Sequence, residues 1–195
     1  MKLKTLAEIA QISTGHTFKG KAETLNNKTG NTVIQIKDVV EGLFDNNKNL
    51  PLANEEHGVS LSKLKESDLL IPMRGNRKTV MQINKLDSEQ NIIASSQLAM
   101  ITVEHQLVLP RYLLWYFNSD VGKAKLHSLS VGSTIPQINI KSLKKLEVEI
   151  PDLLTQSTIC DIYTNWLEQK KNLRMLLKNG TELTNEACLS LIQEN

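Results

Sequence analysis

The residues best equipped for chemistry lie in a loop that follows a short apolar stretch. The sequence LIPMRGNRKTV, residues 70–80, leaves this apolar stretch at Pro72 and enters a run of cationic and amide side chains. Arginine can bond guanine O6 and N7 in a bidentate manner, asparagine can bond adenine, and lysine and threonine can reach phosphates. The chemistry indicated is hydrogen bonding to nucleic acid, and the candidate DNA-binding residues here are Arg74, Asn76, Arg77, Lys78 and Thr79.

Two further polar loops carry the same kinds of side chain. One is GHTFKGK, which begins at Gly15, and the other is VGSTIPQINIKSLKK, which begins at Val131. Taken singly, such a loop is more typical of a solvated surface than of a DNA contact, but three of them in one small chain favour a shared binding face. The candidate DNA-binding residues are His16, Thr17, Lys19 and Lys21 in the first loop and Ser133, Thr134 and Gln137 in the second.

No recognisable catalytic or metal-binding pattern accompanies these loops. The sequence has no Walker A, GxGxxG, HExxH or GxSxG motif, and its four histidines lack the spacing of metal ligands. One formal match to a nuclease pattern joins Asp152 to Glu168 and Lys170. Its second half lies in a stretch of helical heptad spacing, whereas such a site needs groups converging from paired strands. The sequence therefore predicts no catalytic residue, no metal and no cofactor.

The elements that must position these loops are short strands and helices in mixed order. Val-rich and Ile-rich runs predict strands in TVIQIKDVV, LLIP, TVMQINK, NIIASSQLAMITV and LEVEIP. Helical spacing is predicted for LKTLAEIAQISTG as far as Gly15, for a short turn in LSKLKES, and for LPRYLLWYFNSDVGKAKLHSLS. The segment EGLFDNNKNLPLANEE is expected to be a loop. The fold class predicted is α/β (α+β), a globular domain of mixed strands and short helices followed by one long C-terminal coiled-coil helix.

That C-terminal helix is predicted from a stretch with neither proline nor glycine, Leu154 to Lys178, and Gly180 is expected to end it. A helix of about 25 residues extends close to 40 Å at 1.5 Å per residue, more than a compact domain of this size requires. Two interpretations stay open: the helix packs on its own domain, or it pairs with a second long helix. An a/d heptad seam with one polar member supplies the candidate dimerisation residues, Ile159, Ile162, Trp166, Gln169, Leu173 and Leu176.

Composition limits the class of protein. The 195 residues suit one domain with an appendage, and 40% hydrophobic residues can build a packed core. Because the formal net charge is only +2, any binding of a polyanion must come from a local patch. Cys160 and Cys188 are expected to be reduced. Without an apolar run typical of a signal peptide or a membrane span, the expected location is the cytoplasm, with no membrane partner.

Several segments together resemble the DNA specificity subunits of type I restriction–modification systems. That family has a Gly-Ser/Thr pair, a short helix, a strand ending in Ile-Pro, and a helix start with Gln and Ile three residues apart. LAEIAQISTGHTF resembles the family's opening, IQIKDV and LKESDLLIPMRG its later strands, and PRYLLWYFNSD the helix after them. The resemblance spans essentially the whole chain in family order, and its matched positions in the last segment are Gly132, Ser133, Ile138, Leu143, Leu146, Val148, Ile150, Pro151, Leu154, Gln156 and Ile159.

Two positions depart from that family pattern. Thr155 stands where the family usually has glutamate, and Ser67 stands where glycine usually precedes the Asp of DLLI. A larger departure is size, because a typical specificity subunit carries two target-recognition domains and two long helices. This sequence contains one of each, as a half-subunit would.

The resemblance implies a division of labour along the chain. Residues 1–151 would be a target-recognition domain that reads one half of a bipartite double-stranded DNA site, with Arg74 or Arg77 on a base and Lys78 on a phosphate. Residues 152–195 would be a spacer helix and C-terminal tail that pairs with a second copy in a homodimer. Separate modification (methyltransferase) and restriction subunits would be the partners and supply catalysis. An alternative stays open, an orphan DNA-binding or interaction protein of the same fold without a modification complex.

Overall fold

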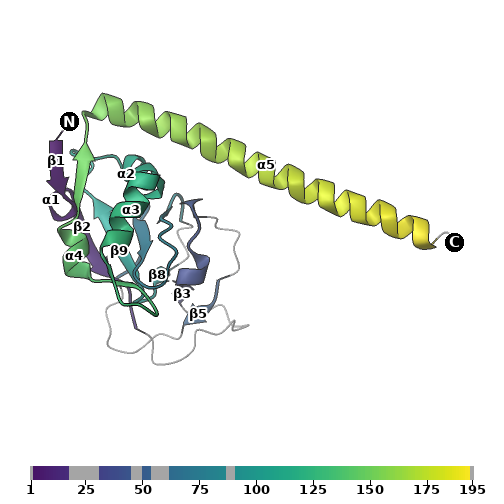
Figure 1. Ribbon diagram of the computed structural model, residues 1–195, viewed down its shortest axis with the longest axis horizontal. Helices are drawn as coiled ribbons and strands as arrows, with labels where there is room; N and C mark the ends of the chain where they lie inside the picture. Colours follow the sequence, from purple (N-terminus) through teal and green to yellow (C-terminus); the bar gives the residue numbers. More distant parts are fainter. Residues whose placement is uncertain (1, 18–30, 45–49, 54–61, 87–90, 194–195) are drawn as a thin grey trace. The chain divides into compact units, whose positions relative to one another are not determined.

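The computed structural model describes residues 2–17, 31–44, 50–53, 62–86 and 91–193. The chain divides into two units, residues 1–157 and residues 158–195, which we call the first and the second unit. The first unit contains every strand and all short helices of the described residues, and the second continues one long helix (Figure 1). The predicted fold class, mixed strands and short helices followed by a long C-terminal helix, is confirmed.

The prediction of an N-terminal helix that reaches Gly15 is wrong. Only one turn, α1 (Leu6–Ile9), is helical, and it lies between the strands β1 (Lys2–Thr5) and β2 (Ala10–Thr14). β1 pairs antiparallel with β12 (Glu147–Ile150), and β2 pairs antiparallel with β9 (Leu98–Val103). These ladders join residues that lie 85 or more positions apart in the sequence, so tertiary pairing overrides the local helical spacing.

A five-stranded sheet forms the centre of the first unit. Its order is β2-β9-β6-β7-β4, where β6 is Leu69–Pro72, β7 is Met81–Gln82 and β4 is Gly42–Leu43. β9 runs antiparallel to both β2 and β6, and its first residues pair with the last residues of those strands. The C-terminal ends of β2 and β6 and the beginning of β9 therefore lie at the same edge of the sheet.

A second sheet has three strands in the order β5-β3-β8, which are Leu52–Ala53, Asn31–Ile34 and Ile92–Ala94. The strand predicted for TVIQIKDVV stops at the end of β3, because a single 3-10 turn, η1 (Ile36–Asp38), follows it. The segment predicted as a loop, EGLFDNNKNLPLANEE, contains the two-residue strands β4 and β5. Side chains from both sheets form one hydrophobic core: Ile34, Val39, Phe44, Leu50, Leu64, Leu70, Met81, Ile83, Ile92, Ala94, Leu98 and Met100.

The helix predicted from Leu109 onward is two helices, α2 (Pro110–Asn118) and α3 (Asp120–Ser128). The break falls at Ser119, which is extended and caps α3, since its hydroxyl accepts from the Gly122 N–H at 3.2 Å. In α2, the aromatic residues Tyr112, Tyr116 and Phe117 are buried together with Leu113. The helical turn predicted in LSKLKES is absent from residues 62–68, where Asp68 N–H donates to Lys65 O across a tight turn.

The remaining elements complete the first unit and lead into the second. β10 (Ser130–Val131) and β11 (Gln137–Ile138) form an antiparallel pair, and α4 (Ile140–Lys144) follows. The long helix, α5, runs over Leu153–Gln193 and is 41 residues long, about 60 Å at 1.5 Å per residue.

The prediction that the long helix ends at Gly180 is wrong, because α5 continues to Gln193. One glycine costs a helix only about 1 kcal/mol relative to alanine, which the flanking residues outweigh. The hydroxyls of Thr181 and Thr184 donate to carbonyls four residues earlier, at Leu177 and Gly180, so both hydroxyls have hydrogen-bond partners inside the continuing helix. No helix in the described part of the chain has the length and apolar character to cross a bilayer, and neither Cys160 nor Cys188 forms a disulfide.

Candidate nucleic-acid interface

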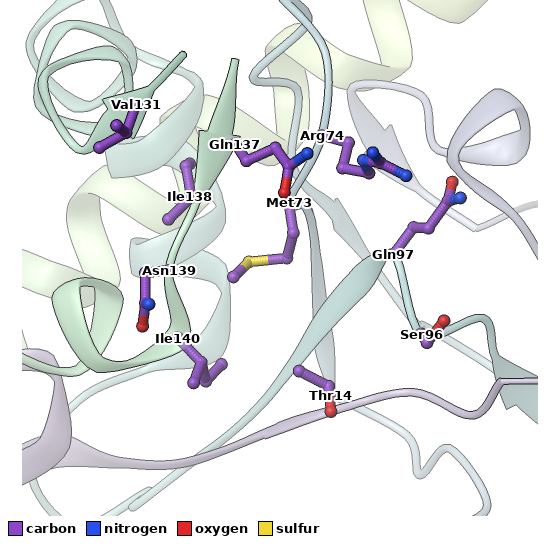
Figure 2. Close-up of a pocket in the computed structure, with 10 residues that line it drawn as sticks. All are labelled: Thr14, Met73, Arg74, Ser96, Gln97, Val131, Gln137, Ile138, Asn139 and Ile140. Carbon is purple, nitrogen blue, oxygen red and sulfur yellow. The ribbon is translucent and has the colours of Figure 1, made fainter. Parts of the chain in front are cut away.

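Parts of all three predicted loops meet at the sheet edge where β2 and β6 end and β9 begins. A cleft of about 850 Å³ lies there. Figure 2 shows the residues around it, which come from the end of β2, the residues after β6, the turn before β9, and the β10–α4 segment. They are Thr14, Met73, Arg74, Ser96, Gln97, Val131, Gln137, Ile138, Asn139 and Ile140.

The β10–β11 hairpin is joined to the residues that follow β6. Gly75 N–H donates to Pro136 O at 2.9 Å, and Ile138 N–H donates to Met73 O at 2.9 Å. Arg74 thereby faces Gln137 as an isolated antiparallel bridge pair. Gly75 adopts a φ of 86°, a left-handed conformation that suits glycine and turns the chain away from the sheet. Two of the predicted loops are therefore one structural unit held by backbone hydrogen bonds.

The remaining loop, GHTFKGK, meets the turn between β8 and β9 at Gly15. A Cβ at this position would clash with the carbonyl oxygens of Ala94 and Ser95, so only glycine allows the two backbones to approach this closely. The same turn is tied to β6, because Met73 N–H donates to the Gln97 carbonyl at 2.9 Å. The turn therefore joins the beginning of the GHTFKGK loop to the loop that follows β6.

Arg74 is exposed and lines the cleft. With the Gln137 amide oxygen turned toward it, that oxygen accepts from Arg74 Nη2 at 3.0 Å and from Nε at 3.2 Å. A second hollow of about 510 Å³ also includes Arg74 and Gln97 in its lining, together with the exposed Lys37. Arg74 and Gln97 therefore stand between two hollows, and their polar groups are accessible from solvent.

The other two cations of the loop are bound to the protein itself. Arg77 Nη2 donates to the carbonyls of Ile36 and Val39, at 3.1 and 2.8 Å, and so caps the 3-10 turn. Lys78 is buried, its ammonium donates to Gly75 O at 2.8 Å, and burial lowers the pKa of this lysine. Phosphate binding by Lys78 and base reading by Arg77 stay predictions. The hydrogen bonds that both side chains make to backbone carbonyls stabilise the conformation of the loop.

The remaining candidates are spread around the same face. His16 is half-buried, and its Nε2 accepts from Ser62 N–H at 3.0 Å, whereas Thr17 is exposed. Lys19 and Lys21 lie outside the described residues. Asn76, Ser133 and Thr134 are also exposed, and none of the hydrogen bonds described above joins them to Arg74 or Gln137. Thr79 is half-buried.

Four polar residues of the cleft were not predicted: Thr14, Ser96, Gln97 and Asn139. The sequence contains a signal for two of them, Ser96 and Gln97. The polar triplet Ser95–Gln97 interrupts an apolar run that otherwise resembles one strand. In the structure this triplet is a turn, closed by a bond from Leu98 N–H to Ser95 O at 2.9 Å. Asn139 caps α4, since its side chain accepts from Lys141 N–H at 2.8 Å. Within the described residues, no three His, Cys, Asp or Glu side chains cluster as a metal site.

The first turn of α5 is anchored within the first unit by Gln156, which is fully buried. Its Oε1 accepts from Leu109 N–H at 2.8 Å, and its Nε2 donates to the carbonyls of Leu107 and Pro151 at 3.3 and 2.9 Å. Asp152 precedes the helix and accepts from the N–H and the hydroxyl of Thr155, both at 2.9 Å, and these bonds lower the pKa of its carboxyl. These hydrogen bonds hold the first turn of α5 within the first unit.

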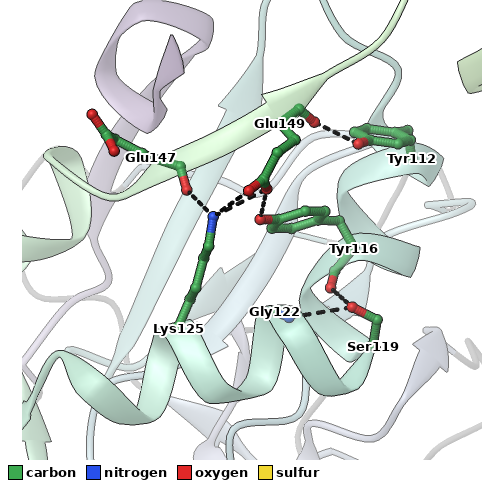
Figure 3. A network of polar contacts seen from close by, with 7 residues as sticks. All are labelled: Tyr112, Tyr116, Ser119, Gly122, Lys125, Glu147 and Glu149. Carbon is green, nitrogen blue, oxygen red and sulfur yellow. Dashed lines mark hydrogen bonds and ion pairs between the residues drawn. The ribbon is translucent and has the colours of Figure 1, made fainter. Parts of the chain in front are cut away.

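A polar network holds β12, the strand before that first turn, against α2 and α3 (Figure 3). The Glu149 carboxylate accepts from Tyr116 Oη and, at 2.9 and 3.0 Å, from Lys125 Nζ. These hydrogen bonds to Tyr116 and Lys125 lower the pKa of Glu149. Tyr112 Oη donates to the Glu149 carbonyl at 2.5 Å, and burial is the main cause that raises the pKa of Tyr112 to about 12.

The predicted seam on α5 is largely exposed within its own unit. Ile159 is half-buried, but the exposed fraction is 67% for Ile162 and 70% for Leu176. Trp166, Gln169 and Leu173 are also exposed. A shallow groove of about 660 Å³ lies farther along the helix, lined by Leu173, Leu176, Leu177, Gly180, Thr181, Thr184 and Asn185. An apolar face of this length is unusual on a helix that contacts only solvent.

Comparison with known proteins places this geometry in context. The family model described as "Type I restriction modification DNA specificity domain" matches residues 1–177. A curated relative, the type I restriction enzyme HindI specificity subunit of Haemophilus influenzae, is 32% identical over 140 residues. That alignment covers 67% of this chain and 28% of the relative, so the chain spans less than a third of that protein's length.

Solved structures share the fold at low sequence identity. The S subunit of a type I restriction–modification system from M. genitalium has a TM-score of 0.65 and 16% identity, over 95% of this chain and 44% of that one. The HsdS subunit of Thermoanaerobacter tengcongensis has a TM-score of 0.57 and 16% identity, over 87% and 37% of the two chains. A chain from a study of complex assembly and conformational transition of the type I R-M system has a TM-score of 0.62 and 17% identity, over 87% and 38%.

Proposed function

Because the chain belongs to the family of type I restriction–modification DNA specificity domains, we propose that it recognises a DNA sequence on behalf of such a system. Residues 1–151 read one half of a bipartite double-stranded site, and residues 152–195 form the spacer helix and tail. Methylation and cleavage are carried out by separate modification and restriction subunits. The prediction that this chain is a specificity component rather than an enzyme agrees with its family.

One observation carries the proposal for the first unit: segments far apart in sequence place exposed hydrogen-bonding side chains around one cleft. Arg74, Gln97 and Gln137 come from three different segments and all line it. Guanidinium and amide groups are those that read base edges in the major groove. With a net charge of only +2, this organised polar face is a better basis for specific binding than bulk electrostatic attraction.

Selection from a pool of randomised DNA duplexes tests this proposal. The full chain is used alone and together with the methyltransferase subunit that it captures from its own cells. We expect enrichment of a motif with two short defined segments separated by a spacer of fixed length. Failure of both preparations to enrich any motif, at low and at physiological salt, would contradict sequence-specific recognition.

We further propose that the long helix pairs with its counterpart in a second copy and forms a homodimer. The support is the seam, where Ile162, Leu173 and Leu176 are exposed at heptad spacing within the second unit. A two-fold pair of recognition domains would suit a palindromic split site.

Light scattering across a dilution series tests the pairing. Leu173→Gln or Leu176→Gln removes two leucines from a symmetric interface, at about 1.5–3 kcal/mol each, so the dimer dissociation constant should rise at least about 100-fold. Met175→Gln is the matched control, because Met175 is exposed on the same helix but lies off the seam. A monomeric wild type, or equal effects of Leu176→Gln and Met175→Gln, would contradict the proposed pairing.

The alternative function, an orphan DNA-binding protein of the same fold, differs in its partners. A mild pull-down of the tagged chain from its own cells distinguishes the two. Stoichiometric recovery of a methyltransferase subunit supports the modification complex. Recovery of the chain alone, with an enriched DNA motif in the selection above, supports the orphan binder.

A further inference from the structure

We propose that Arg74 reads a guanine in the major groove and that Gln137 is the positioning residue that fixes the plane of its guanidinium. This inference rests on the proposed function, since it assigns one base contact to the recognition face. It gives Arg74 a different role from Arg77 and Lys78, the two other cations of the same loop. It also gives Gln137 an indirect role in place of a DNA contact of its own.

The hydrogen bonds to Gln137 occupy one edge of the arginine and leave another edge open. With the Gln137 amide oxygen turned toward Arg74, that oxygen accepts from Nε and Nη2, which share the side edge of the guanidinium. The outer edge, formed by the two terminal nitrogens, still has N–H groups directed away from Gln137. Two parallel N–H donors in one plane match the O6 and N7 acceptors of guanine.

Both residues sit on backbone that is already ordered. The bond pair Gly75–Pro136 and Ile138–Met73 brackets the Arg74–Gln137 bridge on both sides. Buried Lys78 and the Arg77 cap hold the loop beyond Gly75. A long arginine side chain loses rotamer entropy when it binds, and prior restraint by Gln137 reduces that loss.

A base contact explains this restraint better than a phosphate contact does. A phosphate oxygen accepts from a cation in many orientations, so a fixed plane adds little to that contact. In-plane bidentate contact with a base edge requires the fixed plane. Lys37, which is exposed and lines the second hollow beside Arg74, has no such amide partner in the described contacts and suits a phosphate.

The test compares five variants of the full chain, one of them a control, in the randomised-duplex selection, and it also measures their salt-dependent affinity for the wild-type motif. Arg74→Ala should lose preference for guanine at one position by about 10- to 100-fold and keep the other positions. Arg74→Lys keeps the charge, so it should lose the same preference while the salt dependence stays close to wild type. Gln137→Met should weaken that preference at the same position, and the Arg74→Ala/Gln137→Met double variant should be no worse than Arg74→Ala. Lys37→Ala is the control and should weaken binding to all sequences alike.

The possible results distinguish a failure of this inference from a failure of the proposed function. A wild type that enriches no motif overturns both. A wild-type motif that Arg74→Ala enriches unchanged overturns only the guanine contact. Uniform weakening by Arg74→Ala, with the salt slope reduced by about one and near-normal binding by Arg74→Lys, makes Arg74 a phosphate contact. Unchanged guanine preference in Gln137→Met overturns the positioning role.

Discussion

Replacing Gln156 by methionine should destabilise the first unit more than any exposed substitution on the same segment. Methionine has a similar length and retains the apolar part of the side chain, but it lacks both the amide donors and the oxygen acceptor. The change removes the three bonds to Leu109 N–H, Leu107 O and Pro151 O. Because Gln156 is completely buried, water cannot replace these partners without opening the structure.

The expected magnitude follows from the groups left unpaired. A buried backbone donor or acceptor without a partner costs about 1–3 kcal/mol. The Leu109 N–H and the Pro151 carbonyl lose their bonds of 2.8 and 2.9 Å, whereas the 3.3 Å bond to Leu107 is the weakest. We therefore expect the free energy of unfolding to fall by about 2–4 kcal/mol, after allowance for the apolar burial that methionine keeps.

Urea unfolding followed by Trp115 fluorescence measures this change, with Trp166→Phe in every protein so that only the first unit is reported. Gln106→Met is the matched control, since Gln106 is exposed just before Leu107 and should change stability by less than about 0.5 kcal/mol. A loss for Gln156→Met no larger than that of Gln106→Met would refute the anchoring role of Gln156.

Three further substitutions follow from particular backbone and side-chain environments. Ser67 has a φ of 74°, so Ser67→Gly should raise the free energy of unfolding by about 0.5–1 kcal/mol in urea titrations, and a loss would contradict the inferred strain. Gly15→Ala should lower it by about 1–3 kcal/mol because the added methyl meets fixed backbone, whereas Gly180→Ala, with open space around it, should raise the helix melting temperature. The pKa of Tyr112 is raised to about 12, so the folded state keeps a proton that the unfolded state releases near pH 10. Stability should then fall as pH rises from 10 to 12, less steeply in Tyr112→Phe, and equal slopes for both proteins would contradict this assignment.

Much of the fold was predictable because its strands follow apolar runs. The strand predictions at LLIP, TVMQINK and LEVEIP fall on β6, β7 and β12. Local spacing failed where long-range pairing decided the structure, as in residues 2–14, which pair with β12 and β9. It also failed at Gly180, because one glycine inside a long helix costs only about 1 kcal/mol and does not end it.

Ser67 shows how a departure from a family pattern can have a structural meaning. The family usually has glycine there, and the structure gives this residue a left-handed backbone. Glycine adopts that conformation without strain, whereas serine does so at a cost. The departure therefore concerns local backbone energy and leaves the fold unchanged.

The candidate site was predictable as a set of loops but not as a set of roles. Arg74, Arg77 and Lys78 are equivalent in sequence, since all three are cations within five residues of one another. Their roles diverge because the β10–β11 hairpin brings Gln137 to Arg74, η1 offers its carbonyls to Arg77, and packing buries Lys78. No local pattern specifies these tertiary partners.

Methylome sequencing of the cells that encode the chain tests its central role most directly. The modified bases are compared among the parent, a strain lacking the chain, and the deleted strain with the chain restored. We expect one bipartite methylated motif that disappears on deletion and returns on restoration. Persistence of every methylated motif in the strain lacking the chain would contradict it.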